Sequence, residues 1–271
     1  IRDRAALFPE NERGSAMSKI YAAQLLGIAM GPLIGVFITL NHLGVAFLFA
    51  GLASAIAGVF TLRTLPPTPA ETHQEPLPKV QFTSQVIGAV VGSAAVGLCV
   101  GVYETCWSLL MHTYGASTLQ IRLSWTFFCL PWVILASVGG KLADRFDRRI
   151  IAVLGGLNGA FFLFLYPHLH HIPLLIMLGS GEAVGAALCV PALSSMLTQG
   201  AHDRELGRRQ GISTTANTAA LALSAVVSGS LFSISPGLPF TVISITSATL
   251  VLSQIFWWRN TPGHINHDAS N

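Results

Sequence analysis

Long apolar stretches are the feature that most constrains this chain. A helix that crosses a bilayer needs about 20 consecutive, mostly apolar residues, and about eight stretches of this kind follow one another here. They run near residues 15–40, 44–62, 85–111, 119–142, 150–166, 172–198, 207–232 and 239–258. The pattern therefore predicts an all-α polytopic membrane protein of about eight transmembrane helices joined by polar connections.

The composition supports this reading and excludes others. Of the 271 residues 52% are hydrophobic and only 10% are charged, whereas a soluble domain carries about 25% charged residues. No nucleophile elbow, zinc-helix motif or phosphate-binding loop is present, so an enzyme is not expected. A clustered basic face is also missing, so no nucleic-acid partner is expected. We expect no metal or cofactor, and we interpret His168, His170 and His171 as solvated loop residues.

The basic residues predict the orientation in the membrane. If the segment before the first apolar stretch is cytoplasmic, every second connection lies on that side. Almost all Lys and Arg residues then lie there too, and only Arg122 falls near the opposite face. This is the positive-inside bias of membrane proteins. It predicts a multi-pass protein of the cell inner membrane with a cytoplasmic C-terminal tail.

Two short motifs go beyond a generic helix bundle. The segment GGKLADRFDRR, residues 139–149, resembles the loop signature of the major facilitator superfamily, with matches at Gly140, Leu142, Asp144, Arg145, Arg148 and Arg149. The segment GIAMGPLIG is similar to the helix-five motif of the proton-driven drug antiporters, with matches at Gly27, Gly31, Pro32 and Gly35. In the first motif Asp147 stands where the family usually has a second glycine.

The resemblance implies a register. It gives this chain helices five to twelve, so the expected fold lacks the first four helices of the family. Residues 1–62 would hold the last two helices of the N-terminal half, 63–84 a proline-rich cytoplasmic linker, 85–259 the six-helix C-terminal half and 260–271 a polar tail.

The resemblance also implies a function. It indicates secondary active transport of a small solute across the bilayer, with proton-coupled efflux as the expected form. Uptake or exchange of a metabolite on the same fold is the alternative, and a truncated membrane protein without transport activity is a further one.

The loop signature has a mechanical interpretation. In the family this loop helps to hold the cytoplasmic side shut, so Gly140, Asp144, Arg145, Arg148 and Arg149 are predicted to form a cytoplasmic latch. Two simpler readings remain open. A carboxylate such as Asp144 can cap a helix start, and basic residues beside a membrane favour the cytoplasmic face by themselves.

Two acidic residues within the apolar stretches are the candidate functional site. An ionisable side chain inside a membrane costs at least ~2.5 kcal/mol on insertion scales, so its presence calls for a reason. The resemblance places Glu104 in helix seven and Glu182 in helix ten, which line the central cavity. Glu182 has no basic residue at its depth and is predicted to bind a proton or a cationic substrate. Glu104 is the second candidate, with an ion pair to Arg122 as the alternative.

Overall fold

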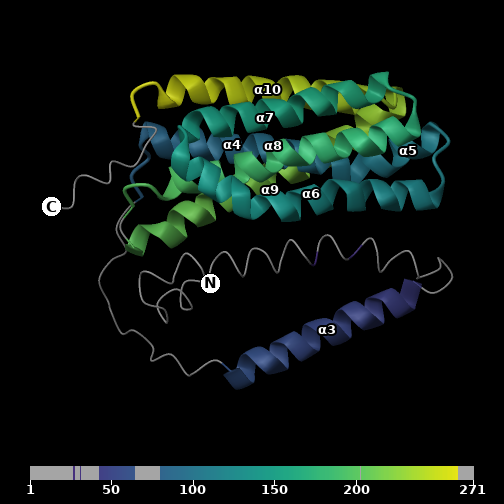
Figure 1. The fold of residues 1–271 in the computed structure, drawn as a ribbon, viewed down its shortest axis with the longest axis horizontal. Coiled ribbons are helices and arrows are strands. Elements are labelled where there is room, and N and C mark those ends of the chain that lie inside the picture. Colours follow the sequence, from purple (N-terminus) through teal and green to yellow (C-terminus); the bar gives the residue numbers. More distant parts are fainter. Residues whose placement is uncertain (1–26, 28–30, 32–42, 65–79, 202, 262–271) are drawn as a thin grey trace. The chain divides into compact units, whose positions relative to one another are not determined.

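The computed structural model describes residues 27, 31, 43–64, 80–201 and 203–261 (Figure 1). Every regular element within these ranges is a helix, which confirms the predicted all-α class. The chain separates into two units, Ile1–Pro76 and Leu77–Asn271, each of which is considered by itself.

The described part of the first unit is the helix α3, Leu43–Thr64. It corresponds to the second predicted stretch and starts and ends within two residues of it. With 22 residues it has about the length that a membrane-spanning helix needs. The first predicted stretch lies outside the described residues apart from Gly27 and Gly31.

The second unit contains six helices that are long and apolar enough to cross a membrane, counted over the described residues. They match the six stretches predicted after residue 85. The first of them runs unbroken from Ser84 to Thr113. The elements in chain order are α4 (Ser84–Val102), η2 (Tyr103–Trp107), α5 (Ser108–Thr113), α6 (Thr118–Arg145), α7 (Arg148–Leu165), η3 (Tyr166–His168), α8 (Ile172–Thr198), α9 (Asp203–Ile234) and α10 (Leu238–Trp258).

The helices of this unit pack side by side as a bundle (Figure 1). Helix α4 packs on α9 and α10, α8 packs on α6 and α7, and α7 packs on α10. The four cysteines lie in these helices as free thiols. Two buried clusters fill the interior, one that includes Trp107, Tyr166 and Phe240, and another that includes Met196 and Trp258.

Glycine lets α4 approach the backbone of α9. A Cβ added at Gly97 would collide with the carbonyl oxygen of Asn217, and one at Gly101 would collide with that of Leu221. The same seam carries hydrogen bonds, because the Asn217 side chain donates to the carbonyl oxygen of Ser93 at 2.8 Å. In lipid, where apolar burial cannot drive association, close backbone approach and interhelical hydrogen bonds hold helices together.

Candidate functional site: a buried carboxyl in an aromatic pocket

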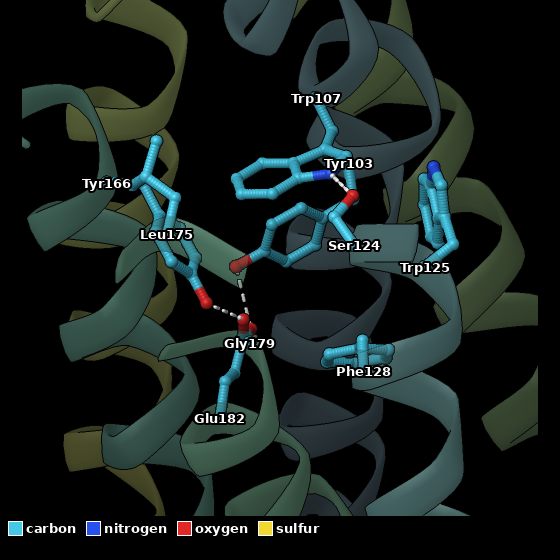
Figure 2. Close-up of a pocket in the computed structure, with 9 residues that line it drawn as sticks. All are labelled: Tyr103, Trp107, Ser124, Trp125, Phe128, Tyr166, Leu175, Gly179 and Glu182. Atoms are coloured by element: carbon cyan, nitrogen blue, oxygen red, sulfur yellow. Dashed lines mark hydrogen bonds between the residues drawn. The ribbon is translucent and has the colours of Figure 1, made fainter. Parts of the chain in front are cut away.

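Glu182 lies in the first half of α8 and is 5% exposed. Both of its carboxyl oxygens accept a hydrogen bond from a tyrosine. The Tyr103 hydroxyl donates to Oε1 at 2.7 Å, and the Tyr166 hydroxyl donates to Oε2 at 2.8 Å (Figure 2). An ionised carboxyl group is acceptor-only, so two hydroxyl donors match its ionised form. The two tyrosine hydroxyl groups would therefore stabilise the negative charge of ionised Glu182.

A local change in helical geometry positions Tyr103. Residues Tyr103–Trp107 form η2, a π-helical turn between α4 and α5. Such turns widen a helix by one residue and are frequent at functional sites. Its first and last residues are tethered to different helices. Tyr103 reaches Glu182 on α8, and the Trp107 indole N–H donates to the Ser124 hydroxyl on α6 at 2.8 Å.

Tyr166 comes from the opposite wall, at the end of α7. It begins the single turn η3, and Pro167 follows it. Proline removes a backbone donor and clashes with the preceding turn, which favours the end of the regular helix here. The Tyr166 ring packs edge-on against Trp107, with centroids 4.9 Å apart, and the side chain is 1% exposed.

These side chains line a pocket of about 350 Å³, a volume that includes space open to its surroundings. Its walls come from η2, α6, α8 and the end of α7 (Figure 2), and its lining residues are Tyr103, Trp107, Ser124, Trp125, Phe128, Tyr166, Leu175, Gly179 and Glu182. The pocket thus presents aromatic faces around one carboxyl group, an arrangement suited to a cation.

Gly179 opens this pocket one helical turn before Glu182. Side chains on a helix lean toward its N-terminus, so Glu182 extends over the turn that contains Gly179. A Cβ added at Gly179 would have one neighbour within 4 Å, Phe128, at 3.9 Å. The glycine therefore leaves space beside the carboxyl group.

The structure separates the two predicted acids. Glu182 lies in the pocket, whereas Glu104 is an exposed residue of η2 that does not line it. The side chains of adjacent residues in a helical turn point in different directions, so Tyr103 faces Glu182 and its neighbour Glu104 does not. The role of Glu104 as a second site remains a prediction.

The predicted latch residues lie at the α6–α7 connection. Gly140, Asp144 and Arg145 belong to the last turns of α6, and their side chains lie outside the described part. The residue that caps α7 is Asp147, which the sequence comparison singled out only as a departure from the family. Its Oδ1 accepts the backbone N–H of Arg149 at 2.9 Å.

The Arg149 side chain links α7 to the end of α10 through hydrogen bonds, and we call this contact the clasp. Its guanidinium donates to Asp147 and also to the carbonyl oxygens of Trp258 and Thr261, at 3.3 and 2.6 Å. A cation is favourable at the C-terminal end of a helix, where carbonyl groups lack partners. Arg148, its neighbour, is 5% exposed. Of the predicted helix-five motif, the structure describes Gly27 and Gly31, whereas Pro32 and Gly35 lie outside the described residues.

The aromatic partners of Glu182 were not predicted. Tyr103 and Tyr166 are 79 and 16 residues away from it along the chain. A tyrosine within an apolar stretch carries a polar group that needs a partner, and this need was the signal available in the sequence. This need does not identify the group to which the tyrosine hydroxyl binds.

Comparison with known proteins agrees with this architecture. The sequence model of the family described as Major Facilitator Superfamily matches residues 4–103 and 89–270. The chain is also 27% identical over 116 residues to a protein of Bacillus subtilis (strain 168) described as "Uncharacterized MFS-type transporter YfiS". That match covers 43% of this chain and 28% of the relative. Because the family match extends over nearly the whole sequence, this chain belongs to the Major Facilitator Superfamily.

Proposed function

We propose that this protein exports a small solute in exchange for protons, and that Glu182 is the residue that carries the proton. The family is one of membrane transporters, which supports transport of a solute rather than catalysis. The single observation that carries the finer proposal is the buried carboxyl group of Glu182, which lies in an aromatic pocket with hydroxyl donors on both oxygens.

The proposed exchange follows from hydrogen-bonding capacity. Ionised Glu182 accepts from both tyrosines, and a cationic solute in the pocket would find the carboxylate together with aromatic faces. Protonation turns one oxygen into a donor and removes the charge. A proton and a cationic solute would therefore compete for the same group, which is the requirement for exchange of one for the other.

The remaining parts of the proposal come from the sequence. The latch residues Gly140, Asp144, Arg145, Arg148 and Arg149 would hold the cytoplasmic side closed in one state. The motif Gly27, Gly31, Pro32 and Gly35 would allow close helix packing in the other half of the transporter. Glu104 is the second candidate for the proton site, and its variant is compared with that of Glu182 below. The positive-inside bias supports an inner-membrane orientation with the C-terminus in the cytoplasm.

Transport by Glu182→Gln tests the central point. The intact protein would be reconstituted in liposomes with an imposed pH gradient and assayed with a solute panel that includes the cation ethidium. We expect proton-driven transport to be lost in Glu182→Gln, because the amide cannot exchange a proton at this site. Wild-type rates and wild-type pH dependence in this variant would contradict the proposal.

Glu104→Gln is the comparison variant, because it removes an acidic residue of η2 that lies outside the pocket. We expect it to retain pH-dependent transport. If Glu104→Gln loses coupling and Glu182→Gln keeps it, the proton site belongs to Glu104 instead. Uptake driven by the same gradient would favour the alternative of metabolite import.

A further inference from the structure

The two tyrosines that donate to Glu182 differ in how deeply they are buried. Tyr166 is 1% exposed. Its ring lies 4.9 Å from the Trp107 ring and 6.3 Å from the Phe162 ring. A residue packed in this way cannot withdraw its hydroxyl without opening the core around it.

Tyr103 is only partly buried, and part of its surface faces the pocket. The ring centroids of Trp107, Tyr166, Phe128 and Phe240 lie between 6.0 and 6.5 Å away. Its backbone belongs to the π-helical turn η2. Figure 2 shows its ring between the Glu182 carboxyl group and the indole of Trp107.

The pocket also leaves space beside the carboxyl group. Gly179 lies on the pocket wall one turn before Glu182 and leaves its Cβ position nearly free of neighbours. On the other side, the Trp107 tether to Ser124 on α6 can hold the far end of η2 in place while Tyr103 moves.

From these differences we infer that Tyr103 is a displaceable cover on Oε1 of Glu182, whereas Tyr166 is a fixed anchor on Oε2. A proton or solute that enters from the pocket reaches the carboxyl group when the Tyr103 hydroxyl leaves Oε1. Tyr103 is thus a positioning residue that sets access to Glu182. This inference rests on the proposed role of Glu182 as the exchange site.

The test measures access to the carboxyl group and does not require a known solute. Dicyclohexylcarbodiimide, an apolar reagent that modifies protonated carboxyl groups, would be applied to the intact protein in liposomes. Modification of Glu182 would be followed by peptide mass spectrometry, with Glu182→Gln as the blank. Tyr103→Phe removes the cover and keeps the ring. We expect it to raise the labelling rate roughly fivefold, the order that corresponds to loss of one neutral hydrogen bond.

Tyr166→Phe and Tyr114→Phe are the matched controls. Tyr166→Phe also removes one donor from Glu182, but it leaves the cover on Oε1 in place, so its labelling rate should stay well below that of Tyr103→Phe. The Tyr114 hydroxyl donates to the carbonyl oxygen of Pro167 at 2.9 Å and not to Glu182, so Tyr114→Phe should label like wild type. Equal rates in Tyr103→Phe and Tyr166→Phe would overturn the inference.

One further variant is expected to slow the labelling of Glu182. It tests whether faster labelling reflects only a general loosening of the bundle. Gly179→Val fills the space beside Glu182, and labelling should become slower than in wild type although Tyr103 is intact. Labelling at the wild-type rate or faster would contradict the role of this space.

Labelling and transport separate the two proposals. If Tyr103→Phe labels fast but Glu182→Gln still transports with wild-type pH dependence, the cover is real and the proposed exchange site is wrong. If Glu182→Gln loses coupling but Tyr103→Phe labels like wild type, the exchange site stands and the cover is wrong.

Discussion

The guanidinium of Arg149 donates to the carbonyl oxygen of Thr261 at 2.6 Å and so joins the start of α7 to the segment after α10. The two residues are 112 positions apart in the chain. The same guanidinium pairs with Asp147, the residue that caps α7. One side chain thus ties a helix start, a loop and a helix end together.

The first prediction concerns this clasp. Arg149→Gln removes the charge and the fork of donors, and we expect it to lower stability by about 1–2 kcal/mol, because hydrogen bonds to charged groups are stronger than neutral ones. Arg149→Lys keeps the charge but loses the planar fork, and it should fall between wild type and Arg149→Gln. Thermal unfolding in detergent would measure both. Equal stability of all three proteins would argue against the clasp.

The second prediction separates the latch from the helix cap. Asp144→Asn should leave stability nearly unchanged and abolish transport, because it removes the proposed latch charge with little change in shape. Asp147→Ala should lower stability by about 1 kcal/mol, the usual value of an N-cap, and should keep transport. Transport rates normalised to protein amount, together with thermal unfolding, would decide. Normal transport by well-expressed Asp144→Asn would refute the latch role.

The third prediction concerns helix packing. Gly97→Ala would push its methyl group into the backbone of Asn217, which cannot move aside like a flexible side chain. We expect a loss of about 1–3 kcal/mol, the range for overpacked interiors. Gly159→Ala is the control, because its Cβ would have no neighbour within 4 Å. The melting temperature should fall in Gly97→Ala alone, and an equal fall in both would show that the α4–α9 contact is not special.

The fourth prediction concerns orientation. In a background without the native cysteines, a cysteine at His170 should react with a membrane-impermeant maleimide added outside the cell. A cysteine at Gly207, an exposed residue near the start of α9, should react only after the membrane is opened. The reason is the one-sided distribution of Lys and Arg. The reverse labelling pattern would invert the proposed topology.

The sequence predicted the helices of the second unit well, since each needs only its own apolar residues to be recognised. The predicted stretch near 172–198 coincides with α8, and the one near 239–258 differs from α10 by one residue. The family resemblance, based on the loop at 139–149, agrees with the family match. The π-helical turn at Tyr103–Trp107 was missed, because its cause lies in contacts with α6 and α8 and not in local preference.

What the sequence determined by itself is therefore the class of protein and the unusual presence of Glu182 in an apolar helix. Both follow from local composition, because a bilayer requires apolar spans and penalises charge wherever it occurs. Only the tertiary structure decided which groups meet that carboxyl group and which acid lines the pocket. Glu104 and Glu182 look alike in sequence. They differ because helix packing buries Glu182 between two tyrosines from distant segments and leaves Glu104 exposed.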